Sequence, residues 1–490
     1  MSEGAFEAVI GLEVHVQLLT RSKMFCGCEN RYGGVPNSRT CPVCLALPGA
    51  LPVLNDEAVK MAIALGFGIH GELRERSVFY RKQYFYPDLP KGYQITQGPV
   101  AIVENGWLEI PGDPRVRAAE GPVRAGIERA HLEEDSGKST HDEGGHISLV
   151  DLNRAGVPLL EIVGRPDLRS PQEASAFLKT LHRLVTFLGI SDGNMEEGSF
   201  RCDANVSIRP VGTAAFGTRV EVKNINSFRN VKLALEHEIQ RQTGLVERGE
   251  SFAQETRGWD AATGETRSQR SKEAAMDYRY FPEPDLPTLV LTAEEIESVR
   301  RRLPELPEAR KARFLTAYGL TDYEASMALQ DRDFADYFER VAQACGNGKQ
   351  TANWMLGEVS RALNDQGVSL SRLGLDPAHL AELIGLVEAR TVNLATAKEV
   401  IFPALLQGAG TPREIVEQRG LAQVSERGAI EALVRGVLDA HAEQVAEWQA
   451  GNEKLGGFLV GQVMKAGKGK ANPRVVNEVL KTMLGETTHE

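Results

Sequence analysis

Apolar and polar residues alternate along most of the chain from its N-terminus to about Pro287. In the segment VIGLEVHVQL, which begins at Val9, nearly every second residue is apolar, and Glu13, His15 and Gln17 occupy positions between them. Side chains alternate between the two faces of a β-strand, so this segment predicts a strand with one apolar and one polar face. Gly, Pro and Asn turns separate similar short segments, which predicts a β-rich region.

Helical signals interrupt this region and then replace it. Two helices are predicted near Asn55–Leu65 and Ser170–Gly189, the second with Ser170 as its cap. From about Thr292 the pattern becomes helical, with capping boxes that begin at Thr292 and Thr321. A third block begins near Thr411, after the break LLQGAGTP.

These patterns predict an α+β protein. The chain has 490 residues, more than one hydrophobic core of roughly 250–300 residues accommodates. We predict a mainly antiparallel β domain with flanking helices at 1–291, an all-α helical domain at 292–407 and a small α-helical tail domain at 408–490.

Composition changes this picture little. The chain is 42% hydrophobic and 25% charged, as in ordinary globular proteins, and its net charge of −11 argues against unselective binding to nucleic acid. We see neither an export signal nor an apolar stretch near the roughly 18 residues that span a membrane. We therefore expect a cytoplasmic protein with no membrane partner.

Glu13 and His15 are the first candidates for chemistry. On one strand face they lie about 7 Å apart, so they can share a cation, although an ordinary solvated face is the alternative. Further acids follow in HLEEDSGKST (residues 131–140) and at Glu161, which lies in an apolar run. HLEEDSGKST lacks the first glycine of a phosphate-binding P-loop and carries three acids instead, so a metal site is the better interpretation.

Later strands repeat a polar face of mixed charge. Arg201 and Asp203 alternate with apolar residues, and Lys223 lies on a similar strand. Such a face is either exposed to water or holds Mg²⁺ and phosphate groups. Two aromatic segments, YFYPDLP at Tyr84–Pro90 and YFPEPDLP at Tyr280–Pro287, could flank one cavity.

Four cysteines give a sharper signal. Cys26 and Cys28 form one pair, and Cys41 and Cys44 form a second pair across a loop rich in Gly, Pro and Asn. Two such pairs suit a tetrahedral, structural Zn²⁺ site, with buried free thiols as the alternative. The C-terminal region is basic and includes Lys465, Lys468 and Lys470, which predicts either contact with a phosphate backbone or a solvated helix end.

Several segments together resemble the B-subunit family of the glutamine-dependent aspartyl/glutamyl-tRNA amidotransferases. They run in the family's order from Ile10 to Pro473. The segments that carry the resemblance are IGLEVHVQL, YPDLPKGYQITQ, HLEEDSGKSTH, LVDLNRAGVPLLEIV, MEEGSFRCDANVSIRP, EVKNINSFRNV, DYRYFPEPDLP and GFLVGQVMKAGKGKANP.

The resemblance implies an ATP- and Mg²⁺-dependent enzyme. The family phosphorylates the side-chain carboxylate of misacylated Glu-tRNA(Gln) or Asp-tRNA(Asn), and ammonia then displaces the phosphate. The resemblance also implies two partner proteins, an amidase-type glutaminase (the A subunit), which supplies the ammonia, and a small C subunit. It further implies that the β domain is the family's cradle domain and that the tail touches tRNA.

The family's metal-binding positions correspond here to Glu13, His15, Glu134 and Glu161, and its zinc site to the four cysteines. Strand parity leaves open whether Glu133 or Glu134 is the ligand. We further expect phosphate or substrate contacts at Arg201, Asp203, Lys223 and Asn224, and tRNA contacts at the three tail lysines.

Two rival hypotheses remain. One is a non-catalytic, zinc-stapled tRNA-binding scaffold with all chemistry in other subunits. The other is the related archaeal-type E subunit, which carries a large inserted domain that we do not find in this sequence.

Overall fold

A computed structural model describes residues 6–117, 121–141, 147–271, 277–422, 427–449, 452, 455–467 and 471–485. The chain forms two compact units, Met1–Arg310 and Lys311–Glu490. The first unit is built on a β-sheet with helices and the second is helical, which confirms the predicted α+β class. The predicted divisions near residues 292 and 408 stay predictions.

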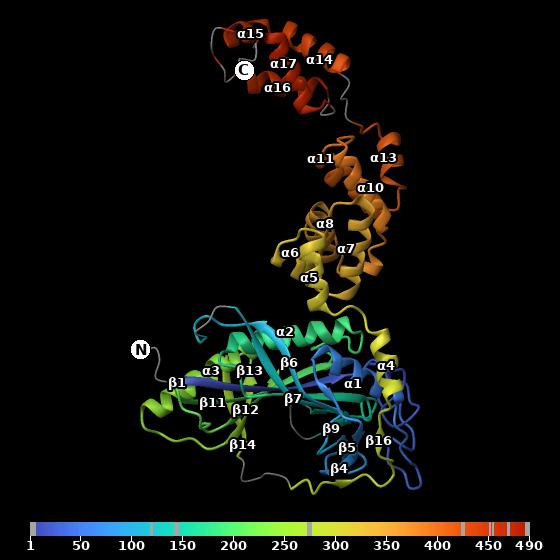
Figure 1. The fold of residues 1–490 in the computed structure, drawn as a ribbon, viewed down its shortest axis with the longest axis vertical. Helices are drawn as coiled ribbons and strands as arrows, with labels where there is room; N and C mark the ends of the chain where they lie inside the picture. Colours follow the sequence, from blue (N-terminus) through green and yellow to red (C-terminus); the bar gives the residue numbers. More distant parts are fainter. Residues whose placement is uncertain are drawn as a thin grey trace. The chain divides into compact units, whose positions relative to one another are not determined.

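A twelve-stranded sheet forms the described part of the first unit (Figure 1). Its strands are β1 (Phe6–Gln17), β2 (Glu72–Leu73), β4 (Phe79–Gln83), β5 (Tyr93–Gln97), β6 (Val103–Pro111), β7 (Pro122–Glu134), β10 (Pro158–Gly164), β11 (Phe200–Pro210), β12 (Val220–Ile225), β13 (Glu255–Asp260), β14 (Glu265–Ser271) and β15 (Phe281–Pro282). Two separate pairs join β3 (Arg76–Ser77) to β16 (Leu289–Val290) and β8 (Lys138–His141) to β9 (Ser148–Asp151).

The central strand is β1, which lies between β10 and β11. The main order is β14-β13-β12-β11-β1-β10-β7-β5-β4-β15, and β6 pairs with β7 and carries β2. Every strand pair is antiparallel except β12 with β13. The mainly antiparallel sheet predicted from alternation is therefore confirmed.

Three helices pack on the apolar face of the sheet: α1 (Asp56–Gly68), α2 (Pro171–Phe187) and α3 (Phe228–Glu247) (Figure 1). Leu12, Val14 and Leu160 of the sheet and Leu181 of α2 belong to one buried cluster. Burial of these side chains stabilises the unit by roughly 1.5–3 kcal/mol for each large residue. The helices leave the opposite, polar face of β1 free for chemistry.

The helix caps explain where α1 and α2 begin. Asn55 and Ser170 accept hydrogen bonds from the backbone N–H groups of Glu57 and Glu173, as N-cap residues do. The Glu173 carboxylate, however, forms an ion pair with Arg117 at 2.6 Å and accepts a bond from the Arg169 N–H instead of reaching back to the cap. Tertiary pairing thus replaces the second half of this predicted capping box.

Helix α3 was missed by the sequence patterns, which gave only two helices in this region. Ser227 caps it by accepting a bond from the Asn230 N–H. Its buried face includes Glu238 and Gln242 as well as Val231 and Leu235, and these polar residues hide the apolar period. Glu238 pairs with Arg241 at 2.6 Å, which offsets the cost of its burial.

Helix α4 (Ala293–Arg302) completes the first unit, α5 (Pro307–Ala317) crosses the division between the units, and the remaining helices belong to the second unit. The α-helices of the second unit are α6 (Asp322–Ala328), α7 (Arg332–Cys345), α8 (Gly348–Trp354), α9 (Ser360–Gln366), α10 (Pro377–Glu388), α11 (Leu394–Thr396), α12 (Phe402–Leu406), α13 (Pro412–Gln418), α14 (Arg427–Ala440), α15 (Ala442–Gln449), α16 (Leu455–Ala466) and α17 (Pro473–Leu484). Two π-helical turns, Met355–Val359 and Ala397–Ile401, and a 3₁₀ turn, Leu370–Arg372, lie between them.

The predicted capping boxes at Thr292 and Thr321 are both present, and a third begins α13 at Thr411. Helices α14, α16 and α17 share a small core that includes Ile430, Leu459 and Val476. Among the described residues, no helix combines the length and apolar character needed to cross a membrane.

Leu181 tests how strongly α2 holds the sheet. It is fully buried, so Leu181→Ala should lower the free energy of unfolding of the first unit by about 2–5 kcal/mol through lost contacts and a cavity. Chemical denaturation monitored by circular dichroism measures the change. Lys179→Ala, on the exposed side of the same helix, is the control and should shift stability by less than about 0.5 kcal/mol. Equal effects of the two variants would contradict this packing.

Candidate active site on the polar face of the sheet

Strand β1 places Glu13 and His15 on the polar face of the sheet. In the strand register His15 lies opposite Glu161 of β10 on one side and opposite Arg201 of β11 on the other. Glu13 lies opposite Asp203. Directly opposed residues of antiparallel strands point to the same face, so these side chains meet above β1.

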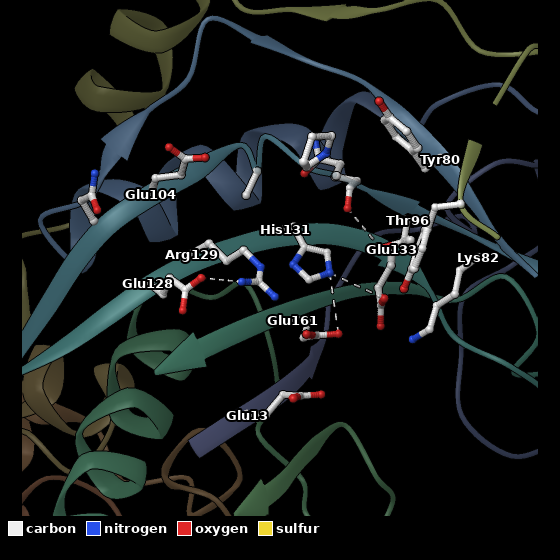
Figure 2. Close-up of a pocket in the computed structure, with 16 residues that line it drawn as sticks. Glu13, Tyr80, Lys82, Thr96, Glu104, Glu128, Arg129, His131, Glu133 and Glu161 are labelled. Carbon is white, nitrogen blue, oxygen red and sulfur yellow. Dashed lines mark hydrogen bonds and ion pairs between the residues drawn. The ribbon is translucent and has the colours of Figure 1, made fainter. Parts of the chain in front are cut away.

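The carboxylates and imidazoles converge at short range. The Nε2 atom of His15 lies 3.4 Å from Oε2 of Glu161 and 3.7 Å from Oε1 of Glu13. From β7, Nε2 of His131 lies 3.6 Å from Oε2 of Glu161 and 3.8 Å from Oε2 of Glu133. Figure 2 shows His131, Glu133, Glu161 and Glu13 arranged around one space. Three neighbouring strands therefore build one cluster.

The structure distinguishes Glu133 from Glu134. Glu133 shares the polar face with His131 and Glu161, whereas Glu134 is the next residue and points to the opposite face. Glu134 forms an ion pair with Lys91 and accepts a hydrogen bond of 3.0 Å from the Ile95 N–H. The structure thus places Glu133 in the cluster and does not bring Glu134 to it, because a period of two fixes the face of each residue.

Crowded negative charge dominates the electrostatics of this cluster. Burial and the charge of Glu161 raise the pKa of Glu133 to about 7, and the same two causes raise the pKa of Glu13. Burial works against a charged His15, but its hydrogen bond to Glu161 and the charge of Glu133 raise its pKa above the ordinary value. Burial lowers the pKa of His131 to about 4, so this imidazole is neutral at pH 7. The site therefore favours an added cation.

Cationic side chains border the cluster. The charge of Glu133 outweighs burial and raises the pKa of Lys82, which keeps this amine protonated. Arg201 donates to Asp135 at 2.9 Å, and Lys223 pairs with Asp203 at 2.6 Å. These positive groups are fixed beside the acids and can face an anionic substrate.

A cavity of about 860 Å³ opens over the cluster. Its wall includes Glu13, Glu133, Glu161, His131 and Lys82 (Figure 2). Tyr80 and Tyr280 border it as well, so the segment that begins at Tyr280 does lie at the cavity, as one of the two predicted aromatic loops. The volume suits an organic ligand together with a metal ion.

The other predicted contacts lie at different places. Asp203 and His15 join Glu13 in a group whose possible ligand atoms lie within 4.8 Å of one another. Asn224 is exposed with a left-handed φ of 68°, at an irregularity of the β11–β12 pairing, and it does not border the cavity. Lys465 is exposed near the end of α16, and Lys468 and Lys470 lie outside the described residues.

The donor set fits a divalent cation. His15, Glu133 and Glu161 offer ligand atoms within 4.8 Å of one another, and Glu13, His15 and Asp203 form the overlapping second group. Carboxylate oxygens suit Mg²⁺, and the raised pKa of Glu133 is the electrostatic cost that a bound cation would remove.

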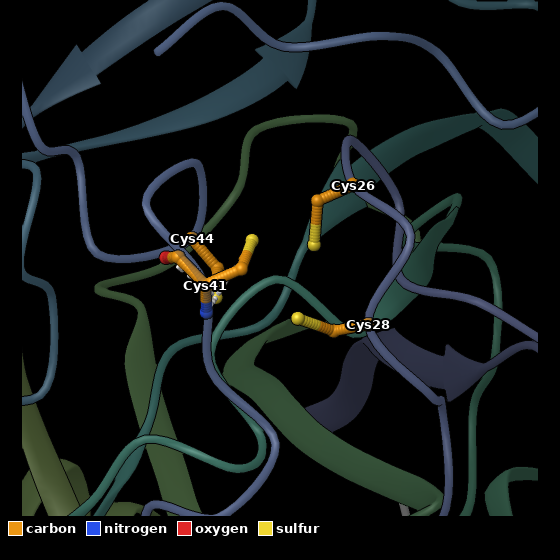
Figure 3. Close-up of side chains that lie close together, drawn as sticks. All are labelled: Cys26, Cys28, Cys41 and Cys44. Atoms are coloured by element: carbon orange, nitrogen blue, oxygen red, sulfur yellow. Dashed lines mark hydrogen bonds between the residues drawn. The ribbon is translucent and has the colours of Figure 1, made fainter.

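The four predicted cysteines form a second candidate metal site, on a loop that follows β1. Their Sγ atoms all lie within 4.8 Å of one another and point inward (Figure 3). Tetrahedral zinc with bonds of about 2.3 Å places neighbouring sulfurs about 3.8 Å apart. The Sγ atoms of Cys41 and Cys44 are 3.8 Å apart. All four cysteines are free thiols, and the geometry fits a structural metal with no open position.

A buried lysine supports the cysteine site. Lys23 is fully buried, and its Nζ lies 3.9 Å from Sγ of Cys44 and donates to the Arg39 carbonyl at 2.8 Å. A hydrogen bond from the Cys26 thiol and the Lys23 charge, among other contacts, lower the pKa of Cys44 to about 5 despite burial. A thiolate is the form that binds a metal.

Comparison with known proteins matches this arrangement to one family. Residues 8–297 match the GatB/GatE catalytic domain, and residues 336–484 match the GatB domain. The chain is 54% identical over 479 residues to the B subunit of the aspartyl/glutamyl-tRNA(Asn/Gln) amidotransferase of Trichlorobacter lovleyi, an alignment that covers 98% of this chain and 99% of the relative. The B subunit of Myxococcus xanthus is 51% identical, again over 98% and 99%. The chain belongs to this B-subunit family.

Membership in the B-subunit family bears on the E-subunit alternative. The match to a GatB domain and the near-complete coverage of both chains leave no room for a large inserted domain. The family's GatB/GatE catalytic domain also contains β1, β7, β10 and β11, the strands that build the cluster.

Sequence reasoning missed several residues at the site of this B-subunit family member. His131, Lys82, Tyr80 and Arg129 border the cavity but carried no prediction. The available signal was the alternation of Arg129, His131, Glu133 and Asp135, which a strand ending at Glu134 sends to one face.

We predict opposite effects for the two neighbouring acids of β7. Glu133→Gln should weaken Mn²⁺ binding, used as a probe for the magnesium site, by at least about tenfold, because it removes a ligand. Glu134→Gln should leave Mn²⁺ affinity within about twofold but lower the melting temperature, because it leaves Lys91 without its charged partner. Calorimetric titration and thermal unfolding check the two results. Loss of Mn²⁺ binding in Glu134→Gln alone would contradict the assignment.

The cysteine site predicts one zinc ion per chain. Cys41→Ser should remove most of the bound zinc, measured by plasma mass spectrometry, and lower the melting temperature, because a three-thiolate site holds the loop less firmly. Cys345→Ser, in the second unit, is the matched control and should keep the zinc. Purified protein without zinc or another metal at stoichiometric level would argue against this site.

Proposed function

We propose that this chain carries the ATP- and Mg²⁺-dependent step of a tRNA-dependent amidotransferase. It phosphorylates the side-chain carboxylate of Glu-tRNA(Gln) or Asp-tRNA(Asn) and amidates the activated group with ammonia. Membership in the B-subunit family supports the reaction class. The observation that carries the proposal is the convergence of Glu13, His15, Glu133 and Glu161 beside Lys82 under one cavity.

The chemistry explains why such a cluster is needed. A carboxylate does not accept ammonia until one of its oxygens becomes a good leaving group. Attack of that oxygen on the terminal phosphorus of ATP releases ADP and gives an acyl phosphate, and ammonia then displaces phosphate. Phosphoryl transfer depends on positioning and on cations that spread negative charge over the transferring group.

We assign the metal ligands from the two overlapping groups. Glu13, His15, Glu133, Glu161 and Asp203 would hold Mg²⁺, with Glu133 in the place that sequence parity left between Glu133 and Glu134. When bound, Mg²⁺ supplies positive charge to the phosphate oxygens. A neutral His131 next to Glu161 adds no competing positive charge and can orient that carboxylate.

The cations of the chain have a separate role in this proposal. Lys82 borders the cavity and stays protonated, so it can face the phosphoryl group or the substrate carboxylate. Arg201 is held by Asp135, which also accepts a bond of 2.7 Å from Gln17. Lys223 is held by Asp203 and Glu221. Asn224 has no place in this set, because it does not border the cavity.

The partners follow from the ammonia requirement. We propose that an amidase-type glutaminase, the A subunit, supplies ammonia and that a small C subunit completes the assembly. We further propose that the basic tail with Lys465, Lys468 and Lys470 contacts tRNA. The printed names of the relatives describe one subunit of an amidotransferase that acts with tRNA(Asn) and tRNA(Gln), which supports a multi-subunit complex.

The activity test compares this proposal with the scaffold hypothesis. Glu161→Gln in the reconstituted complex should reduce ATP-dependent phosphate release on misacylated tRNA by about 100- to 1,000-fold in kcat, because it removes charge that binds the cation. Affinity for uncharged tRNA should stay unchanged.

Glu109→Gln is the control, since Glu109 is an exposed acid on β6 of the same sheet and should keep full activity. Full activity of Glu161→Gln would instead favour the non-catalytic scaffold and place the chemistry in another subunit.

A further inference from the structure

A row of tyrosines leads outward from the cavity and has no role in the chemistry described above. The ring centroids of Tyr86 and Tyr84 are 6.1 Å apart, those of Tyr84 and Tyr278 are 6.1 Å apart, and those of Tyr278 and Tyr280 are 6.0 Å apart. The row joins the two aromatic loops that the sequence showed as a faint repeat. We call Tyr86, Tyr84, Tyr278 and Tyr280 the tyrosine row.

Backbone pairing fixes the tyrosine row in place. Strands β4 and β15 pair antiparallel, and the Gln83 N–H continues the pairing with a bond of 3.0 Å to the Tyr278 carbonyl. The Gln83 side chain donates to the Arg279 carbonyl at 3.1 Å, and the Tyr84 N–H donates to the Gly92 carbonyl at 3.1 Å. The rings are therefore presented by a paired scaffold that limits the entropy lost when a ligand binds.

The tyrosine row is exposed at its two ends and touches the catalytic cluster at one of them. Tyr86 and Tyr280 are 55% and 54% exposed, and Phe85 beside the row is 83% exposed. Tyr280 borders the cavity, and Nζ of Lys82 lies 5.1 Å from the Tyr278 ring centroid. Figure 2 shows Lys82 beside Glu133, so one amine connects the row to the cluster. Exposed aromatic area of this size usually marks a binding surface.

We infer that the tyrosine row binds the unpaired 3′-terminal nucleotides of the aminoacyl-tRNA by stacking on their bases. The inference rests on the proposed function, because it uses the tRNA-linked carboxylate as the substrate. That carboxylate is joined through a short amino acid to the terminal ribose. When it reaches Glu133 and Glu161, the last nucleotides must leave the cavity along its rim, where Tyr280 begins the row.

The chemistry of the surface agrees with single-stranded RNA. Proteins hold unpaired nucleotides by stacking bases on aromatic rings and by contacting phosphates with cations. Arg279 is exposed next to Tyr278 and Tyr280, and its only ion pair given by the described residues is with the equally exposed Asp277 at 3.2 Å. An exposed pair of this kind is weak, so Arg279 can exchange Asp277 for a phosphate.

The adenine of ATP is the other base that the reaction brings to this cavity. It is a single base, whereas the row contains four rings in succession and extends away from the acids that would hold the phosphates. Several consecutive nucleotides use the whole row and one adenine does not. The observations therefore favour the tRNA end over ATP.

A binding experiment with trimmed tRNA tests the inference in the complete amidotransferase complex. The dissociation constant is measured for uncharged tRNA and for the same tRNA without its last three nucleotides. A double variant, Tyr84→Ala with Tyr278→Ala, should weaken binding of intact tRNA roughly 5- to 100-fold, the range expected for loss of base stacking, and should not weaken binding of trimmed tRNA.

Matched variants separate stacking from a folding defect. Tyr84→Phe with Tyr278→Phe keeps the rings and should keep the wild-type affinity for intact tRNA. Tyr323→Ala removes an exposed tyrosine of α6 in the second unit and should change neither affinity. Equal weakening of intact and trimmed tRNA by the alanine double variant would overturn the inference.

Steady-state kinetics then separate this inference from the proposed function. The alanine double variant should raise KM for misacylated tRNA while KM for ATP stays within about twofold and kcat at saturating tRNA is largely kept. A rise in KM for ATP alone would assign the row to adenine and overturn the inference. If the tyrosine variants have no effect while Glu161→Gln still abolishes turnover, the row is not the tRNA site and the proposed function stands.

Discussion

The register of β1 between β10 and β11 is the constraint on which the site depends. It sets His15 opposite both Glu161 and Arg201, and Glu13 opposite Asp203. A shift of one residue would turn these polar groups into the apolar core and bring Leu12 and Val14 to the surface. Because Leu12 and Val14 are fully or almost fully buried beneath helices, the hydrophobic effect that stabilises the sheet also holds the catalytic register.

The polar face concentrates like charges that folding alone would not favour. Glu13 and Glu133 have raised pKa values because burial and the nearby Glu161 oppose their ionised forms. Glu134, on the core side of the same strand as Glu133, has Lys91 and the Ile95 N–H as partners, as buried charges require. Adjacent acids thus separate by face into one that needs an external cation and one that the protein satisfies itself.

The predictable part of the structure came from local patterns. Alternation in VIGLEVHVQL gave β1, and cap residues gave the starts of α1, α2 and α4 to within a residue. The choice between Glu133 and Glu134 was out of reach, because three consecutive acids satisfy either parity and only pairing with β10 decides it. Helix α3 was missed because Glu238 and Gln242 lie on its buried face, where only tertiary partners make them acceptable.

The cysteine site and the catalytic face are joined by backbone hydrogen bonds. The Met24 N–H donates to the Gly156 carbonyl at 2.8 Å, and the Gly156 N–H donates to the Asp135 carbonyl at 2.9 Å. Gly156 has φ +85°, and an added Cβ would lie 3.6 Å from Cβ of Cys44, so glycine suits both the turn and the close packing. Asp135 in turn holds Arg201 and Gln17. A metal that fixes the cysteine loop therefore also restrains the carboxylate that positions Arg201, which gives a structural metal a direct route to the geometry of the active face.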